Sequence, residues 1–166
     1  MSSMAKTKVL FLCTHNSARS QIAEGLLRHL YGDKYEVFSA GTNPTQVNPL
    51  AIKVMAEIGI DISKQYSKNL DFLKDVDIDL VVSVCRSGSK LNCALCSSPI
   101  VMGRPELIRS RLPKAKDYLD HPFDDPSEVE GTGEEKLEAF RRTRDQIKQW
   151  ITQQFADLSE RAMSKT

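Results

Sequence analysis

The sequence predicts an α/β fold: a single three-layer domain in which helices flank a four-stranded parallel sheet. Short apolar runs alternate with amphipathic helical stretches, the runs are apolar on both faces as buried parallel strands are, and no repeat or linker divides the chain. The 166 residues suffice for one domain, and 40% hydrophobic and 27% charged residues are ordinary for a globular protein. We expect the domain to span residues 6–158, between flexible tails at 1–5 and 159–166.

The first half of the chain predicts two strands and two helices. Residues 8–12 form an apolar run typical of a fully buried strand, and residues 20–31 carry the periodicity of a helix with one apolar face. Residues 35–40 predict the second strand. Asn48 is placed to cap a second helix, because Pro49 suits the first helical position.

The second half predicts two further strands and a long final helix. Residues 67–73 predict a short helix, and residues 80–84 predict a fully apolar strand. A short strand is expected near residues 115–119, and residues 134–158 predict a long amphipathic helix. The inward face of that helix is expected to consist of Leu137, Phe140, Ile147, Ile151, Phe155 and Leu158.

Residues 13–20, Cys-Thr-His-Asn-Ser-Ala-Arg-Ser, join the first strand to the first helix. The five residues between Cys13 and Arg19 allow the backbone to close into a cup of N–H groups around a tetrahedral oxyanion, and the helix adds its positive end. Thiols at helix N-termini and beside cations have lowered pKa values, so we expect Cys13 to be a thiolate. The residues expected to bind the anion are Thr14, His15, Asn16, Ser17, Ala18 and Arg19.

Three side chains of this loop have expected roles. Arg19 can present a planar fork to two oxyanion oxygens, Asn16 tolerates a left-handed backbone, and Ser20 can donate a hydrogen bond to the thiolate. A cysteine after an apolar strand is more commonly a buried structural residue. The strand before this loop and the helix after it nevertheless favour a thiolate-dependent enzyme that acts on a phosphate-shaped anion.

Three more cysteines, Cys85, Cys93 and Cys96, lie close together in the chain. In one interpretation they form a redox relay, in which a second thiol attacks Cys13 and a third resolves the disulfide. In another they bind zinc together with His121, although a zinc site usually shows two ligand pairs. In a third they are small buried residues. The polar residues and glycine around them favour the relay, and we expect neither a bound metal nor a cofactor.

Paired carboxylates occur on a turn at residues 121–126, His-Pro-Phe-Asp-Asp-Pro. A group that leaves an oxyanion needs a proton, and Asp125 is placed to supply it. Asp-Pro is also a common turn former, so ordinary turn chemistry is the alternative. Catalytic groups of parallel sheets gather at the carboxyl ends of strands, which predicts that Cys13, Cys85 and Asp125 converge on one crevice.

Net charge and hydropathy exclude several classes of partner. A formal charge of +1 gives no reason to expect nucleic acid or an acidic membrane. No apolar run approaches the length of a transmembrane helix, and the first seven residues are too short and polar for a signal peptide. We therefore expect a monomer in the cytoplasm, where thiols stay reduced.

Several stretches of the chain, together covering about residues 6–155, carry a resemblance to a known family. They lie at 13–25, 39–41, 47–52, 61–63, 80–85 (Leu-Val-Val-Ser-Val-Cys), 123–126 (Phe-Asp-Asp-Pro) and 140–147. In these stretches the chain resembles the low-molecular-weight tyrosine phosphatases, and more closely the thioredoxin-coupled arsenate reductases built on that fold. The anion loop and the Asp-Pro are shared by both branches. Cys85 at the end of a strand, followed by another cysteine, is typical of the reductases.

The resemblance implies a role for each cysteine. Cys13 would attack arsenate within the cradle, and Asp125 would protonate the departing water. Cys85 would then attack the sulfur of Cys13 and release arsenite, and a third cysteine would pass the disulfide to thioredoxin. Cys93 is nearest to the family's position for that third cysteine, one place late, and Cys96 is its alternative.

Two other functions stay open beside arsenate reduction. The first is a phosphotyrosine phosphatase that forms a phosphocysteine at Cys13, and the same loop implies a residual phosphatase activity in a reductase. Such phosphatases carry an aromatic residue after Asp-Pro, where this chain has Ser127, and the loop at 41–46 has none. The second is a zinc-stabilised anion-binding module. Lys68 stands where some relatives place an acidic residue that helps to bind potassium, which puts that ion site in doubt.

Overall fold

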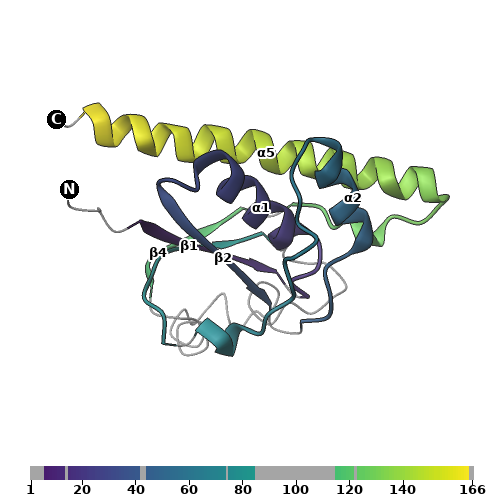
Figure 1. The fold of residues 1–166 in the computed structure, drawn as a ribbon, viewed down its shortest axis with the longest axis horizontal. Coiled ribbons are helices and arrows are strands. Elements are labelled where there is room, and N and C mark those ends of the chain that lie inside the picture. The colour runs from purple at the N-terminus through teal and green to yellow at the C-terminus, as the bar shows by residue number, and fades with distance from the viewer. Residues whose placement is uncertain are drawn as a thin grey trace.

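The computed structural model describes residues 6–13, 15–41, 44–73, 75–84, 115–121 and 123–164. Within them the predicted fold class is confirmed, because four parallel strands form one sheet in the order β2-β1-β3-β4 (Figure 1). The strands are β1 (Thr7–Cys13), β2 (Tyr35–Gly41), β3 (Ile78–Ser83) and β4 (Ala115–Asp120). Leu10 of β1 pairs with Phe38 on one side and with Val81 on the other.

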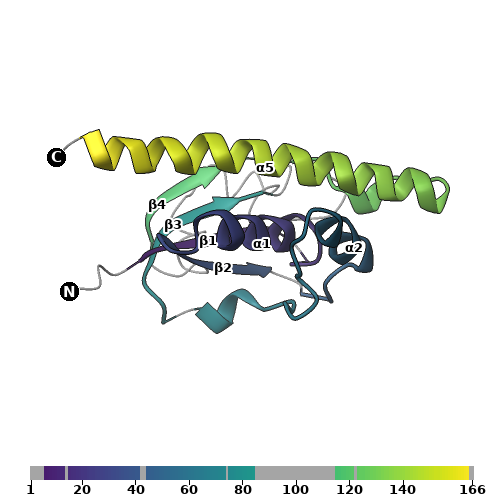
Figure 2. The same ribbon diagram turned by 45° about the horizontal axis from the view of Figure 1, so that its top comes forward.

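Three α-helices pack against one face of this sheet: α1 (Arg19–Tyr31), α2 (Pro49–Glu57) and α5 (Gly133–Ser164). α5 runs the length of the molecule beside α1 and α2 (Figures 1 and 2). Asn48 caps α2 as predicted, since its side chain accepts a hydrogen bond from Leu50 N at 2.9 Å. The cap and the proline after it therefore determine where α2 begins.

β1 is buried on both faces, as its apolar run predicted. Val9 and Phe11 belong to the core beneath the three helices, whereas Leu10 and Leu12 face the other side of the sheet. The 3-10 helix η1 (Leu70–Leu73) packs on that second side. Each large apolar side chain removed from water contributes about 1.5–3 kcal/mol, so β1 contributes to a hydrophobic core on each side of the sheet.

Five of the six residues predicted for the inward face of the final helix are buried, and the helix ends later than predicted. The five are Leu137, Phe140, Ile147, Ile151 and Phe155, whereas the burial of Leu158 stays a prediction. Residues 159–164, which we expected in a flexible tail, are helical, because Ala, Leu, Glu, Arg and Met are strong helix formers and sustain the helix beyond its apolar stripe. Although α5 has 32 residues, no helix of the described chain is long and apolar enough to cross a membrane.

The short helix expected at residues 67–73 is reduced to η1. The residues before it are held by other segments: Lys68 N donates to Asn16 Oδ1 at 2.8 Å, and Lys68 O accepts from Gly41 N at 2.9 Å. These backbone groups are therefore not available for helical bonds. The prediction of a longer helix failed here because the hydrogen-bond partners of Lys68 lie far away in the chain.

β3 is longer than its apolar run, since it begins at Ile78 rather than at residue 80. The polar residue in this extension is Asp79, whose Oδ2 accepts a hydrogen bond from Lys8 N at 2.8 Å. The carboxylate thereby satisfies a backbone donor of the neighbouring strand. The irregular stretch expected at residues 86–113 lies outside the described residues.

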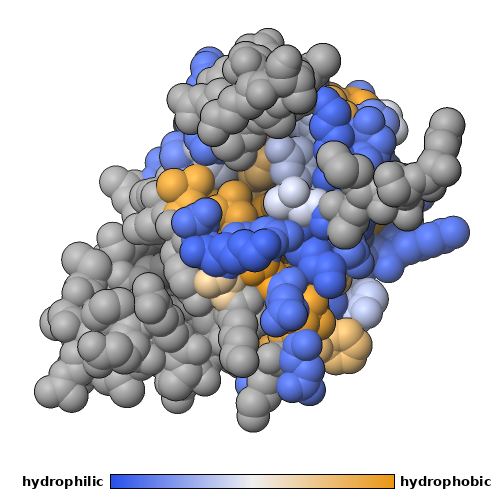
Figure 3. Space-filling view, turned by 90° about the vertical axis from the view of Figure 1, so that its left-hand side faces the viewer, coloured by the Kyte–Doolittle hydropathy of each residue, from blue (hydrophilic) through white to orange (hydrophobic). Residues whose placement is uncertain are grey.

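The two ends of the sheet differ in the residues that lie there. Where the strands begin, the described surface mixes hydrophilic and hydrophobic residues (Figure 3). The strands end at the opposite side of the molecule, where Cys13 is the last residue of β1 (Figure 2). Catalytic groups were predicted at this carboxyl end.

Candidate active site

Cys13 lies at the meeting point of three strand ends, and it is only 3% exposed. Val84 N, just after β3, donates to Leu12 O at 2.9 Å, and Phe123 N donates to Val84 O at 3.2 Å. These bonds bring the segment that carries Asp125 beside the end of β1. Cys13 and Asp125 line one small cavity of about 150 Å³, as the parallel sheet predicted.

The loop after Cys13 is held by hydrogen bonds to its carbonyl groups. His15 O accepts from Thr45 N (3.1 Å), Asn16 O accepts from Gln21 Nε2 (2.9 Å) and Ser17 O accepts from Asn48 N (3.0 Å). In a trans peptide the N–H of the next residue points opposite to the carbonyl, so the N–H groups of residues 16–18 point away from these bonds. The cup of N–H groups around an oxyanion stays a prediction, and Thr14 lies outside the described residues.

Ser20 connects this loop to the sulfur of Cys13. The Ser20 hydroxyl is buried, lies 2.8 Å from Cys13 Sγ and accepts a hydrogen bond from Asn16 Nδ2, also at 2.8 Å. Because the amide nitrogen can only donate, the single hydroxyl proton is available for the sulfur. A Cys13 thiolate can only accept, so in that state Ser20 donates to the sulfur, as the sequence predicts, and the bond stabilises the thiolate.

Asn16 supports the loop from within the protein. It is fully buried and has a φ of 49°, the left-handed conformation that the sequence predicted. Its Oδ1 accepts from Lys68 N at 2.8 Å, and its carbonyl accepts from Ser67 Oγ at 2.7 Å. Asn16 thus ties the anion loop to residues 67–68, a contact that the sequence did not predict.

Arg19 joins the anion loop to the Asp125 segment. Its Nη1 donates to Phe123 O at 3.1 Å, and its Nη2 donates to Asp125 Oδ2 at 3.3 Å. The sequence predicted a fork aimed only at the anion, whereas the structure shows the guanidinium bound to protein groups as well. A guanidinium has five N–H donors, so Arg19 can hold Asp125 and still contact an anion in the cavity that it lines.

Asp125 combines turn chemistry with a place in the cavity. Its Oδ1 accepts from Ser127 N at 3.0 Å and from Ser127 Oγ at 2.7 Å, which starts the 3-10 helix η2 (Pro126–Glu128). The carboxylate is 7% exposed and faces the same cavity as Cys13. The turn interpretation of Asp-Pro is confirmed, and the turn places the Asp125 carboxylate in the cavity, whereas the role of Asp125 as an acid stays a prediction.

The described lining of this cavity is polar. Across from the anion loop the walls consist of Thr45, Asn48, Asp125 and Ser127, and no Phe, Tyr or Trp is among the described lining residues. A phosphotyrosine ring needs an apolar surface to cover it. The described cavity therefore suits a small inorganic oxyanion better than an aryl phosphate.

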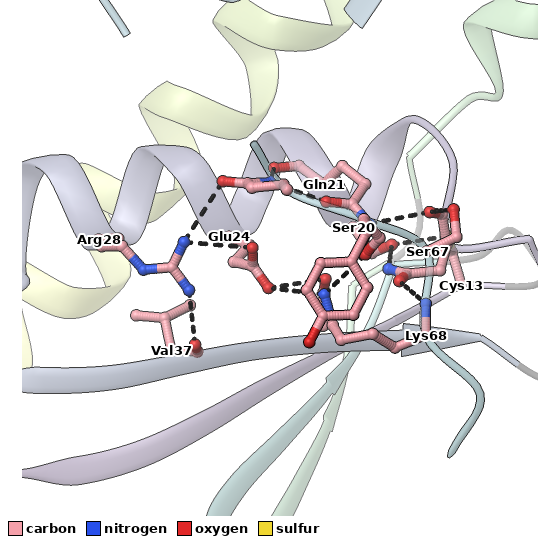
Figure 4. A network of polar contacts seen from close by, with 12 residues as sticks. Cys13, Ser20, Gln21, Glu24, Arg28, Val37, Ser67 and Lys68 are labelled. Carbon is pink, nitrogen blue, oxygen red and sulfur yellow. Dashed lines mark hydrogen bonds and ion pairs between the residues drawn. The ribbon is translucent and has the colours of Figure 1, made fainter. Parts of the chain in front are cut away.

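A buried carboxylate, Glu24, lies one turn beyond Ser20 in α1 and was missed by the sequence analysis (Figure 4). Its Oε1 accepts from Ser39 Oγ at 2.8 Å and lies 3.5 Å from Lys68 Nζ, and its Oε2 lies 3.2 Å from Arg28 Nη1. Only the four-residue spacing of Glu24 and Arg28 could have indicated an ion pair. Burial lowers the pKa of Lys68, and the Glu24 carboxylate opposes that shift.

The same lysine bears on the potassium site of some relatives. Lys68 Nζ also donates to Tyr66 O at 2.8 Å, so an ammonium group already lies against the Glu24 carboxylate and a carbonyl oxygen. A second cation there would be repelled by it. The residues of this chain therefore do not fit a potassium ion beside Glu24.

The other predicted thiols and the zinc alternative stay as predictions, because Cys85, Cys93 and Cys96 lie outside the described residues. His121, the fourth ligand of that alternative, stacks between Phe123 and Trp150 at ring distances of 4.7 and 4.8 Å. Its buried Nδ1 has no partner among the described residues.

These features place the protein among α/β proteins that carry a buried cysteine thiol in a small polar cavity at the carboxyl end of a parallel sheet. Comparison with known proteins narrows this class. The family model described as low molecular weight phosphotyrosine protein phosphatase matches residues 8–164, and the chain belongs to that family.

Several relatives within the family are arsenate reductases by name. The chain is 42% identical over 144 residues to an arsenate reductase of Halalkalibacterium halodurans, covering 87% of this chain and 91% of that protein. It is 34% identical over 152 residues to a glutaredoxin arsenate reductase of Synechocystis, covering 92% and 98%.

Solved structures show the same similarity. An arsenate reductase in the phosphate binding state has a TM-score of 0.66 at 32% identity and covers 91% of this chain and 98% of its own. A thioredoxin-dependent arsenate reductase of Corynebacterium glutamicum has a TM-score of 0.57 at 27% identity, covering 93% and 65%.

Proposed function

We propose that this protein reduces arsenate to arsenite with Cys13 as the nucleophile. The observation that carries the proposal is the environment of the Cys13 sulfur, which lies 2.8 Å from the Ser20 hydroxyl and shares one polar cavity with Arg19 and Asp125. The relatives named arsenate reductases match nearly the whole chain and support arsenate as the anion.

In the first step the Cys13 thiolate attacks the arsenic atom of arsenate. A sulfur–arsenic bond forms, an arsenic–oxygen bond breaks, and the departing hydroxyl group takes a proton from the protonated form of Asp125 and leaves as water. Arg19 and the N–H groups of the loop stabilise the negative charge on the remaining oxygens. The adduct still contains arsenic in its +5 state.

In the second step Cys85 attacks the sulfur of Cys13. A disulfide forms, and the electron pair of the sulfur–arsenic bond stays on arsenic, which leaves as arsenite in the +3 state. Cys93 then attacks Cys85, so that the disulfide moves to Cys85–Cys93 and the Cys13 thiolate returns. Cys96 is the alternative resolving thiol. The relay rests on the sequence and its resemblance, since these three cysteines lie outside the described residues.

Thioredoxin is the reductant that we propose for the last disulfide. A dithiol protein can supply the two electrons that the cycle consumes, and one structural relative is a thioredoxin-dependent arsenate reductase. The glutaredoxin relative makes a glutaredoxin the competing reductant. Because the relay needs reduced thiols, we propose a cytoplasmic location, with the protein acting as a monomer.

Hydrolysis of phosphotyrosine through a phosphocysteine is the second candidate, favoured by the family match. It would need only Cys13, the anion loop and Asp125. The described cavity offers no aromatic residue for the substrate ring, and Ser127 follows the Asp-Pro turn. We therefore expect a residual activity on small aryl phosphates rather than efficient hydrolysis of phosphotyrosine.

The test couples the protein to thioredoxin, thioredoxin reductase and NADPH, with hydrolysis of p-nitrophenyl phosphate measured in parallel. We expect NADPH oxidation that depends on arsenate, and Cys13→Ser should abolish both activities because they share one nucleophile. Either activity at the wild-type rate in that variant would exclude Cys13. Turnover only with glutaredoxin and glutathione would exclude thioredoxin as the reductant.

A further inference from the structure

We propose that the Lys68 ammonium is an internal cation that positions the anion loop, in place of a bound metal ion. It neutralises Glu24 and holds residues 66–68 against Asn16, so that Ser20 reaches the sulfur of Cys13. Lys68 is thus a positioning residue for the proposed reaction. Its effect on the Cys13 thiol can be measured whether or not arsenate is the substrate.

The charge of Glu24 needs a partner inside the protein. A buried carboxylate must be paired, because an isolated charge in a protein interior is strongly unfavourable. The Glu24 side chain is 3% exposed, and its two cationic neighbours differ: the Lys68 side chain is 11% exposed, whereas that of Arg28 is 49% exposed. Water screens the arginine far more than the lysine. Lys68 therefore supplies the countercharge inside the protein.

Hydrogen bonds connect the Lys68 ammonium to the anion loop. Lys68 Nζ donates to Tyr66 O, the carbonyl that also accepts from Gln21 Nε2 at 3.0 Å. That same Gln21 nitrogen donates to Asn16 O. The Tyr66 carbonyl and the Gln21 amide thus connect the Lys68 ammonium to Asn16 O. Figure 4 shows Gln21 and Lys68 within this network.

The backbone of Lys68 is also bonded to the anion loop. Lys68 N donates to Asn16 Oδ1, and Asn16 Nδ2 donates to the Ser20 hydroxyl that lies 2.8 Å from Cys13 Sγ. A side chain pulled toward Glu24 therefore fixes the peptide that orients Asn16. Loss of the ammonium should loosen this chain of bonds and weaken the donation from Ser20 to the thiolate.

Another small cation can take the place of the Lys68 ammonium if the lysine is shortened. Two of the groups that contact Lys68 Nζ are oxygen acceptors, the Glu24 carboxylate and the Tyr66 carbonyl, and the third is the face of the Tyr66 ring, whose centroid lies 4.6 Å away. Shortening the lysine would leave an oxygen-lined space with a negative charge. Such a space suits a small monovalent cation, whereas a bulky cation cannot enter it.

The experiment compares Lys68→Met with Lys64→Met, a matched control that removes the same charge from an exposed lysine on the same segment. The readout is the rate of Cys13 alkylation by iodoacetamide as a function of pH, with the Cys13 peptide quantified by mass spectrometry. We expect Lys68→Met to raise the Cys13 pKa by about one unit, which is a tenfold change in the thiolate equilibrium. Lys64→Met should leave it unchanged.

A second arm tests the cation directly with Lys68→Ala. Ammonium or potassium chloride should restore Cys13 reactivity in this variant, tetramethylammonium chloride at equal ionic strength should not, and the wild type should respond to none of the three salts. A folded Lys68→Met with the wild-type Cys13 pKa would overturn the proposal, as would a wild type that needs potassium. If Lys68→Met does not fold, Lys68→Arg takes its place: a retained Cys13 pKa supports the internal cation, and a raised one contradicts it.

Discussion

Asn16 shows how much a single residue contributes to the candidate site. It is the one non-glycine residue of the described chain with a positive φ, and its amide and carbonyl bind residues on two segments, the start of α1 and residues 67–68. A left-handed backbone costs most residues about 1–2 kcal/mol. Asparagine adopts that conformation at lower cost, and its side chain also forms hydrogen bonds that hold the loop.

The strain at Asn16 can be separated from its hydrogen bonds with two substitutions. Asn16→Ala and Asn16→Gly both lose the side-chain bonds to Ser20 and Lys68, but only alanine resists the left-handed φ. The unfolded chain of the glycine variant has more conformational freedom, which lowers its stability relative to alanine by about 0.4–1 kcal/mol and offsets part of the strain in alanine. We therefore expect the alanine variant to be less stable than the glycine variant by about 0.5–1 kcal/mol, measured by urea unfolding. An alanine variant as stable as the glycine variant, or more stable, would contradict backbone strain at position 16.

Between elements, an ion cluster holds α2 to α5. Glu57 at the end of α2 accepts from Arg141 Nη2 at 2.8 Å and from Arg144 Nη1 at 3.0 Å, and Arg144 Nη1 also donates to Val54 O at 2.9 Å. Hydrogen bonds from Arg141 are the largest cause that lowers the pKa of Glu57 below 4.5. The final helix is thereby fixed to the part of the chain that follows the anion loop.

Glu57→Gln tests this connection through its pH dependence. The folded-state pKa of Glu57 is lowered, so its contribution to stability is present above the unfolded-state pKa and is lost as pH falls through the folded-state pKa. At pH 7 we expect a lower Tm for the variant, and the difference from wild type should shrink below about pH 4. Glu138→Gln, which removes one exposed contact to Arg141, is the matched control and should change Tm less.

At the scale of the whole molecule, the strand order 2-1-3-4 brings the chemistry together. β1 lies next to β3, and β3 next to β4, so the segments that follow the three strands lie side by side at one edge. The proposed relay uses this arrangement, because Cys85 directly follows the residue that bonds Leu12 O and Phe123 N. Thiols can exchange a disulfide only when their Cα atoms come within about 7 Å.

Cys85→Ser separates reduction from hydrolysis. We expect the variant to lose thioredoxin-coupled turnover while it still hydrolyses p-nitrophenyl phosphate, since hydrolysis needs only the anion loop and Asp125. If both activities persist, the relay is wrong and the phosphatase function takes its place. Disulfide mapping of the wild type after one arsenate turnover should show a Cys85–Cys93 link, whereas a Cys85–Cys96 link would make Cys96 the resolving thiol.

The sequence by itself determined the elements and the nucleophile loop. Buried strands and amphipathic helices are local periodic patterns, and they correctly placed β1, β2, α1 and α2 to within a residue or two. The left-handed backbone of Asn16 and the contact of Ser20 with Cys13 were also predictable, because these residues lie close together in the chain.

Only the tertiary structure decided which groups support that loop. The contacts of Lys68 with Glu24, of Lys68 with Asn16 and of Arg19 with Asp125 join residues that are 44, 52 and 106 positions apart. No local pattern encodes such pairs, since each depends on the order of the strands and on where the intervening chain returns. Burial is likewise a property of the packed molecule, and it is burial that makes the charges of Glu24 and Lys68 depend on one another.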